Sequence, residues 1–338
     1  MAESLLRVRE LRTYFYTESG IARAVDGVSF DVAAGETVAL VGESGCGKSV
    51  TALSLLRLIR PPGRVEPTST IEFEGKNLAT LGESEMRAVR GARLSMVFQE
   101  PMTALNPVFT VGDQIAEVVR VHHAGNRREA WERAVRMLET VGIPAPAQRA
   151  HEYPHQLSGG MRQRVVIAMA LVMNPALVVA DEPTTALDVT IQAQILELLR
   201  DLQAKTGTSI LLITHDLGVV AETASRVLVM YGGEIVEEAN VRDAFANPHH
   251  PYTEGLLNAM PRVGSHRERL ATIPGSVPPA TAWPSGCRFR DRCAYAWDRC
   301  AAEHPPLYEI AKGHVSRCHL ADEPARRVPH AVDDRRAS

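Results

Sequence analysis

The chain has 338 residues, a formal net charge of −3 and a hydrophobic fraction of 45%. This length allows one large core and a smaller one, and the weak negative charge argues against nucleic-acid binding through bulk electrostatics. No run approaches about 18 uninterrupted apolar residues, so no membrane-spanning helix is expected. The start, Met1-Ala2-Glu3-Ser4, lacks the pattern of a secretory signal. We therefore expect a cytoplasmic protein that meets a membrane only through partners.

Short runs rich in β-branched and apolar residues dominate the first hundred positions and predict strands. One of them, residues 37–41, is a continuous apolar run typical of a buried parallel strand, and it leads into a glycine-rich segment. A helix is predicted to follow over residues 48–59 and to end at Pro61-Pro62. The other predicted strands cover residues 5–16, 24–32, 70–73 and 94–98, with a turn at Ser19-Gly20 between the first two.

The middle of the chain becomes helical between about residues 110 and 173, with breaks near Gly142 and Tyr153. Asp188 is placed to cap a further helix, which has one apolar face and ends at Gly207. This alternation of helices with strands predicts an α/β fold with a mostly parallel sheet. The later strands are predicted over residues 177–180, 209–213, 227–231 and 234–237, the last two joined by a Gly232-Gly233 turn.

The glycine-rich segment at residues 42–49 fits the pattern G-x-x-x-x-G-K-[ST] at every position. Its glycines allow backbone amides to turn towards phosphate oxygens, and the helix that starts at Lys48 adds its positive N-terminal end. Lys48 is expected to reach the β- and γ-phosphates, and the Ser49 hydroxyl is expected to bind Mg²⁺. The predicted ATP-binding residues of this segment are Gly42, Glu43, Ser44, Gly45, Cys46, Gly47, Lys48, Ser49 and Val50.

Two acids, Asp181 and Glu182, directly follow the apolar run at residues 177–180. In phosphate-loop ATPases the first carboxylate supports Mg²⁺ and the second polarises the attacking water. Adjacent acids at a strand end are often only solvated, but their order after the phosphate-loop pattern favours a catalytic site. We therefore predict Asp181 as a magnesium residue and Glu182 as the catalytic base.

Between the phosphate loop and these acids lies the segment Leu157-Ser158-Gly159-Gly160-Met161-Arg162-Gln163. It resembles the signature of the ABC-transporter ATPases, and the likeness covers roughly residues 5–262. The resemblance implies a P-loop NTPase ABC ATPase fold with a RecA-like parallel sheet core, an N-terminal antiparallel β subdomain and a helical signature subdomain at about residues 100–175. It also implies a helix N-terminus that contacts ATP bound to an opposing subunit, through Leu157, Ser158, Gly159, Gly160 and Gln163.

The same resemblance implies roles for residues outside these motifs. Gln99 matches the loop glutamine that senses Mg²⁺ and touches the membrane subunit, and Ala186-Leu187-Asp188 resembles the loop that crosses the dimer interface. His215 resembles the switch histidine at the γ-phosphate and joins Glu182 as a catalytic residue. For adenine the family uses an aromatic ring near the N-terminus, here Phe15, with Tyr14 and Tyr16 as alternatives.

Four of the five cysteines lie near the C-terminus, with the spacing C-x₅-C-x₆-C-x₁₇-C: Cys287, Cys293, Cys300 and Cys318. In a reducing compartment such a cluster indicates metal ligands more than disulfides. The spacing leaves the metal open between structural zinc and an iron–sulfur cluster. Four free thiols, or a structural tail without metal, remain the alternatives.

The composition of the chain changes after about residue 261, at the start of the region that contains the four cysteines. We expect Arg288, Arg290 and Arg292 to favour thiolates, and Phe289, Tyr295 and Trp297 to shield the site. The predicted organisation is an ATPase domain over residues 1–262, a small C-terminal metal-binding module over 263–322 and a disordered tail over 323–338.

Three further segments, residues 101–107, 247–253 and 273–278, are similar to the dipeptide/oligopeptide importer ATPases. Some members of that subfamily carry a [4Fe–4S] cluster on matching cysteines, whereas His249 and His250 are expected to pack or to form hydrogen bonds. The resemblance implies an ATPase subunit at the cytoplasmic face of the membrane that uses ATP and Mg²⁺. Its implied partners are a second ABC ATPase subunit (identical or different), two permeases and an extracytoplasmic peptide-binding protein, with no nucleic acid. The alternatives are a nickel or other small-solute importer, and a soluble ABC ATPase of translation or repair.

Overall fold

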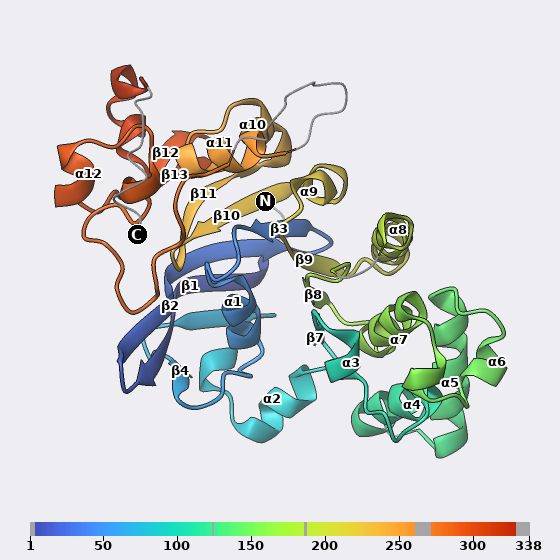
Figure 1. Cartoon of the computed structure of the whole chain (residues 1–338). Helices are drawn as coiled ribbons and strands as arrows, with labels where there is room; N and C mark the ends of the chain where they lie inside the picture. Colours follow the sequence, from blue (N-terminus) through green and yellow to red (C-terminus); the bar gives the residue numbers. More distant parts are fainter. Residues whose placement is uncertain (1–3, 124, 186–187, 261–271, 329–338) are drawn as a thin grey trace. The chain divides into compact units, whose positions relative to one another are not determined.

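The computed structural model describes residues 4–123, 125–185, 188–260 and 272–328. The chain forms two compact units. Figure 1 shows the elements of the whole chain, coloured along the sequence. The first unit contains Val32–Thr37 and Thr80–Ile213, and the second contains Leu6–Asp31, Val38–Ala79 and the chain from Thr214 onwards. In the part that the structure describes, no helix is both long and apolar enough to cross a membrane.

An antiparallel sheet in the second unit follows the predicted N-terminal strands. Its order is β2-β1-β5-β6, with β4 also paired to β1. On β1, Leu6 and Val8 are fully buried, and so are Leu11 and Thr13. The change of phase between the two pairs occurs at Glu10, whose φ of 49° marks a local irregularity of the strand. The strands are β1 (Ser4–Thr17), β2 (Gly20–Ala33), β4 (Gly63–Val65), β5 (Thr70–Phe73) and β6 (Lys76–Asn77).

The phosphate-loop segment joins β3 (Thr37–Val41) to α1 (Lys48–Leu55) in the second unit. All five residues of β3 are buried, and β3 pairs in parallel with β10 (Arg226–Tyr231). The helix was predicted to reach residue 59, and this is wrong: it ends at Leu55. Arg57 adopts φ 52°, and this left-handed conformation cannot continue the helix.

The C-terminal part of the second unit extends the sheet that contains β3. The strand order is β3-β10-β11-β13-β12, and the β10–β11 hairpin turns at Gly232 and Gly233, both with positive φ. Figure 1 shows β13 beside β11. The two strands pair antiparallel, with Glu237 opposite Ser316. The remaining elements are η1 (Leu78–Thr80), α9 (Leu217–Thr223), β11 (Glu234–Asn240), α10 (Val241–Ala246), α11 (Pro251–Asn258), η3 (Arg290–Arg292), α12 (Asp298–Ala302), β12 (Tyr308–Ala311), β13 (His314–Ser316), η4 (His319–Ala321) and η5 (Pro324–Arg326).

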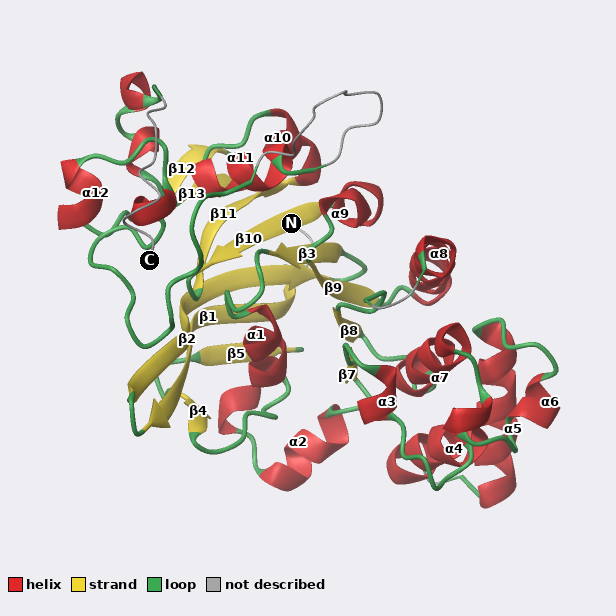
Figure 2. Cartoon of the chain, in the orientation of Figure 1, coloured by secondary structure: helices red, strands yellow, loops and turns green. Residues whose placement is uncertain are grey.

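The first unit combines the parallel strands β7, β8 and β9 with a group of helices (Figure 2). The strand order is β9-β8-β7, and Val179 of β8 pairs with Met96 on one side and Leu211 on the other. Helix α8 begins at its cap Asp188 and ends at Gly207 with φ 70°, as predicted. The elements are α2 (Glu83–Val89), β7 (Leu94–Val97), α3 (Pro101–Ala104), α4 (Val111–His122), α5 (Arg127–Thr140), α6 (Pro146–Arg149), η2 (Pro154–Gln156), α7 (Gly159–Leu171), β8 (Leu177–Asp181), α8 (Val189–Thr206) and β9 (Ser209–Thr214).

The predicted boundary near residue 262 falls in residues 261–271, outside the described part of the chain. Of the predicted tail, residues 329–338 also lie outside it. The described residues 323–328 include the short helix η5, and Arg327 there donates a 2.8 Å hydrogen bond to Glu254.

Candidate functional site

The phosphate-loop segment folds tightly against the backbone of its own unit. Gly42 has φ 155°, and a Cβ there would lie 2.2 Å from the Met230 carbonyl oxygen. Gly47 has φ 112°, and a Cβ there would lie 2.4 Å from the Ala24 carbonyl oxygen. Any other residue at these positions would both clash and adopt a strained backbone. Because Gly47 is the N-cap of α1 and has no side chain, it leaves the first amides of the helix to another acceptor.

Lys48 lies at the start of α1 with its side chain curled back over the loop. Its Nζ donates hydrogen bonds to the carbonyl oxygens of Gly42 (2.8 Å) and Glu43 (3.1 Å). The side chain is buried, so its charge lies within the loop, where a phosphate group would meet it. Cys46 is also buried, and burial raises the pKa of its thiol.

The first unit brings together Glu182 and Gln99. Glu182 follows β8 with φ 45°, and its N–H donates to the Ile213 carbonyl oxygen at 2.9 Å. Its Oε2 accepts hydrogen bonds from Thr185 Oγ1 (2.7 Å) and from Gln99 Nε2 (3.2 Å). Thr185 was not among the predicted site residues, although its place three residues after Glu182 could have suggested this contact.

Asp181 and His215 lie at the ends of neighbouring strands. Asp181 is the last residue of β8 and is buried. His215 follows β9, belongs to the second unit and is exposed. Of the predicted interface loop, Ala186 and Leu187 lie outside the described residues, and Asp188 caps α8 by accepting the Ile191 N–H at 3.0 Å.

The signature segment forms the start of α7. Ser158 is the N-cap, and its Oγ accepts the Met161 N–H at 3.4 Å. Ser158 and Gly159 are exposed, whereas Leu157 and Gln163 are buried and anchor the segment. A Cβ on Gly160 would lie 3.0 Å from Ile191 Cγ2 of α8. The glycine therefore allows α7 and α8 to approach while the helix N-terminus stays accessible.

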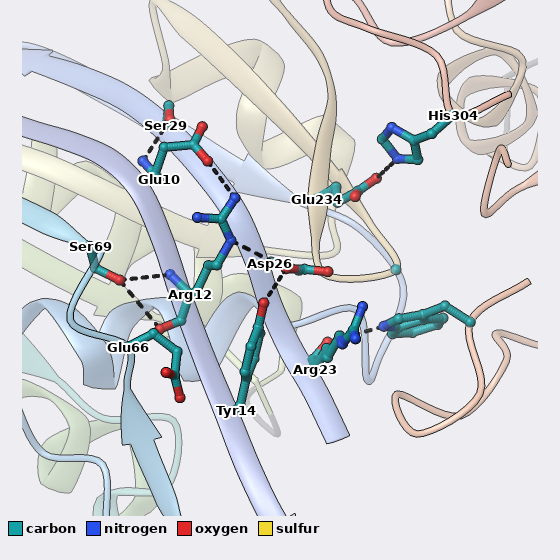
Figure 3. A network of polar contacts seen from close by, with 12 residues as sticks. Glu10, Arg12, Tyr14, Arg23, Asp26, Ser29, Glu66, Ser69, Glu234 and His304 are labelled. Atoms are coloured by element: carbon teal, nitrogen blue, oxygen red, sulfur yellow. Dashed lines mark hydrogen bonds and ion pairs between the residues drawn. The ribbon is translucent and has the colours of Figure 1, made fainter. Parts of the chain in front are cut away.

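The three aromatic candidates for the adenine contact differ in their partners. The Tyr14 hydroxyl donates to Asp26, which Arg12 also approaches at 3.6 Å (Figure 3). Burial, then the hydrogen bond to Asp26, raises the pKa of Tyr14 to about 12. The Tyr16 hydroxyl donates to Glu66 at 2.7 Å. Phe15 lies opposite Gly63 in the β1–β4 pair and is half-buried.

The four C-terminal cysteines line one pocket in the second unit. Its other lining residues include Phe289, Tyr295 and Trp297, the three aromatic residues expected to shield the site, together with His319, which was not predicted. The Cys287 N–H donates to the Cys300 carbonyl oxygen at 2.8 Å, and the Tyr295 N–H donates to Cys293 Sγ at 3.4 Å. The four thiols come from the segments on either side of η3, from α12 and from the N-cap of η4.

The arginines beside the cysteines have hydrogen-bond partners that the sequence did not predict. Arg288 bonds to Asp26 and Arg292 to Glu43, while Arg290 bonds to the Ser285 carbonyl. Burial, and then repulsion from the neighbouring thiols, raises the pKa of Cys287 to about 12. Burial likewise raises the pKa of Cys318 to about 11.

A metal-binding module is not shown by the structure. Across the described residues, no group of three or more His, Cys, Asp or Glu side chains is arranged to hold a metal ion. The chemistry of the pocket lining nevertheless fits an iron–sulfur cluster. Four cysteines line the pocket, and cysteine thiolates are the ligands that hold such clusters. His250, which also lines it, accepts the Tyr252 N–H at 3.0 Å, and His249 contacts Asn247 at 3.0 Å, as expected for histidines that form hydrogen bonds.

Comparisons with known proteins agree with this arrangement of motifs. Residues 25–185 match the family model described as ABC transporter. Residues 236–300 match the model described as oligopeptide/dipeptide transporter, C-terminal region. The second match begins within β11 and includes the first three cysteines of the pocket.

Similar proteins extend the match over nearly the whole chain. The chain is 51% identical to the dipeptide transport ATP-binding protein DppD of Escherichia coli (strain K12), over 96% of this chain and 99% of DppD. It is 52% identical to the oligopeptide transport ATP-binding protein AppD of Bacillus subtilis (strain 168), over 95% of this chain and 98% of AppD. The structure of the ATP-binding cassette MJ0796 bound to ADP and Pi matches with a TM-score of 0.63 and 27% identity, over 70% of this chain and 99% of the cassette. The chain belongs to the ABC transporter family, in the group of ATP-binding subunits of the oligopeptide/dipeptide importer type.

Proposed function

We propose that the chain hydrolyses ATP to drive an ABC importer of di- or oligopeptides. The observation that carries the proposal is the presence in one chain of a phosphate loop, a signature helix and a C-terminal region of the oligopeptide/dipeptide type. The proposal places the chain at the cytoplasmic face of the membrane, where it binds two permease subunits. An extracytoplasmic peptide-binding protein would deliver the cargo.

We propose that ATP binds with its phosphates over residues 42–49. The uncapped first turn of α1 offers backbone N–H groups to the phosphate oxygens. Lys48 exchanges its carbonyl partners at Gly42 and Glu43 for the β- and γ-phosphates. The bound Mg²⁺, which neutralises developing charge on the phosphates, would be held by Ser49, Gln99 and Asp181. Phe15 remains the proposed adenine contact.

Glu182 is the proposed general base for the attacking water. Thr185 and Gln99 both hold its Oε2, so the carboxylate has a defined orientation before substrate arrives. A carboxylate held in this way accepts a proton without first reorganising. His215 is proposed to contact the γ-phosphate.

A second ATPase subunit is proposed to complete the site. The exposed N-terminus of α7, at Ser158 and Gly159, has the character of an anion site, because its amides point outward and no Cβ at Gly159 blocks approach. In a face-to-face pair this terminus would meet the γ-phosphate held by the opposing subunit. Asp188, the N-cap of α8, would lie near the same interface.

The cysteine pocket is proposed to hold a [4Fe–4S] cluster. Cys287, Cys293, Cys300 and Cys318 would bind it, and the bound cluster would supply a redox-active or structural centre. A cluster binds each thiolate through a different iron atom, so its ligands stand farther apart than those of one zinc ion. The lining of one pocket by all four cysteines supports this proposal.

Metal analysis of anaerobically purified full-length protein tests the cluster. We expect about four irons and four acid-labile sulfides per chain, with visible absorption typical of a cluster. Cys300→Ser should lose both, whereas Cys46→Ser, which changes a buried cysteine outside the pocket, should keep the iron. Zinc without sulfide, or no metal, would contradict the cluster.

Reconstitution with the permeases tests the transport proposal. In proteoliposomes that contain the permeases and the partner ATPase, we expect ATP hydrolysis to rise when peptide-loaded binding protein is added outside. The control is the same binding protein without peptide. Stimulation by nickel or another small solute in place of peptides would favour the small-solute importer, and co-purification with ribosomes or DNA instead of permeases would contradict an importer.

A further inference from the structure

Arg292 is a buried arginine that lies next to Cys293 and reaches the phosphate loop. Its Nη1 and Nη2 donate to the two carboxylate oxygens of Glu43, at 2.6 and 3.0 Å. Its Nε donates to the Pro274 carbonyl oxygen at 2.7 Å. All three guanidinium nitrogens are therefore engaged, in the bidentate geometry that only arginine can form with a carboxylate.

Aromatic side chains fix the position of this guanidinium. It lies 5.7 Å from the ring centroid of Tyr231 and 5.9 Å from that of Phe289. The ring of Tyr252 packs against both of these rings, with centroids 4.7 Å and 5.4 Å away. Arg292 thus has little freedom to leave Glu43, because it is held in a packed, largely apolar setting.

The main chain of Glu43 has a second anchor from the same region. The Glu43 N–H donates to the Tyr252 hydroxyl at 2.7 Å, so both the backbone and the side chain of this loop residue are held by residues beyond position 250. Glycines with positive φ at positions 42, 45 and 47 give the unfolded loop many alternative conformations, so the two anchors at Glu43 add to the hydrogen bonds from Lys48 that hold the loop. The two anchors act at the point where the loop leaves β3.

We propose that Arg292 is a positioning residue of the nucleotide site, which holds residues 42–49 in the phosphate-binding conformation through Glu43. This inference rests on the proposed role of residues 42–49 in binding ATP. A loop that is in its competent conformation only part of the time binds ligand more weakly by that fraction. The C-terminal cysteine segment therefore sets the ATP affinity, although it does not touch ATP.

The test measures the binding of a non-hydrolysable ATP analogue with Mg²⁺ to the full-length chain. Arg292→Lys keeps the charge and loses the bidentate geometry, and Glu43→Gln keeps the shape and loses the charge. If the loop is then competent about a tenth of the time, each change raises the dissociation constant about 10-fold. The double variant should be no weaker than either single variant, because both remove one interaction.

The matched control is Arg299→Lys. Arg299 lies next to Cys300 and pairs with Asp322 and Glu323, so it resembles Arg292 in position and partners, but its ion pairs remain within the C-terminal segment. We expect the affinity of the Arg299→Lys variant for the ATP analogue to change less than about twofold. In steady state, Arg292→Lys should raise the KM for ATP with little change in kcat, because Glu182 is untouched.

Three results would overturn the inference: unchanged affinity in Arg292→Lys and Glu43→Gln, additive effects in the double variant, or an equal loss in Arg299→Lys. If Arg292→Lys fails to fold, Glu43→Gln carries the test alone, because the Glu43 side chain is 31% exposed and lies at the loop. If the unmodified chain itself fails to bind the analogue, this result contradicts the proposed function, and therefore also this inference.

Discussion

Glu182→Gln is expected to lower the rate of ATP hydrolysis by about 10²- to 10⁴-fold, the usual contribution of a general base. The amide keeps the shape of the side chain but cannot accept the proton of the attacking water. Hydrogen bonds from Thr185 and Gln99 reach the same side chain, so the local fold should survive. ATP binding should stay close to normal, and steady-state hydrolysis and equilibrium binding measured on the same preparation would separate the two effects.

The matched control for this change is Glu197→Gln. Glu197 lies on α8 of the same unit and is exposed. Its replacement makes the same chemical change at the surface and should leave hydrolysis within about twofold, as is usual away from special features. Near-normal hydrolysis in Glu182→Gln would remove Glu182 from the role of base.

Lys48→Met is expected to weaken ATP binding by at least about 100-fold. Each charge-assisted hydrogen bond contributes about 1.5–3 kcal/mol, and two such bonds to phosphates would account for a loss of that size. Methionine fills a similar volume, so the effect reports the lost charge and donors. The change also removes the bonds from Lys48 to the Gly42 and Glu43 carbonyls, which loosens the loop itself.

Fluorescent or calorimetric titration with Mg-ATP would measure the loss. Lys76→Met provides the control, because Lys76 is exposed in the short strand β6. It removes one positive charge from the same unit without touching the loop. If both variants bound ATP as the unmodified chain does, residues 42–49 would not be the phosphate site.

Local patterns predicted the local features well. The apolar run at residues 37–41, the cap at Asp188 and the two-glycine hairpin each depend on neighbours in the chain, and the structure has all three. Helix α1 is shorter than predicted, because Arg57 adopts a left-handed conformation. The spacing of apolar residues in the sequence does not indicate the backbone conformation of such a residue.

Local sequence patterns did not predict contacts between segments that lie far apart in the chain. Arg292 and Glu43 are separated by 249 positions, and nothing local to either residue marks the other. The same holds for Arg288 and Asp26, which are separated by 262 positions. The gathering of the four cysteines was predictable from their spacing, whereas the strand pairing of β13 with β11 was not.

That strand pairing also changes which backbone the second unit presents to other chains. Without β13, the seven-residue and mostly buried β11 would end the sheet and leave unpaired N–H and C=O groups, a template for aggregation. With the C-terminal strands in place, the sheet ends instead at β12, which has four residues, a register irregularity and an exposed Glu309. Short, irregular and charged edges resist intermolecular pairing. The C-terminal segment therefore replaces a long edge strand with a short and irregular one, independently of any role of its cysteines.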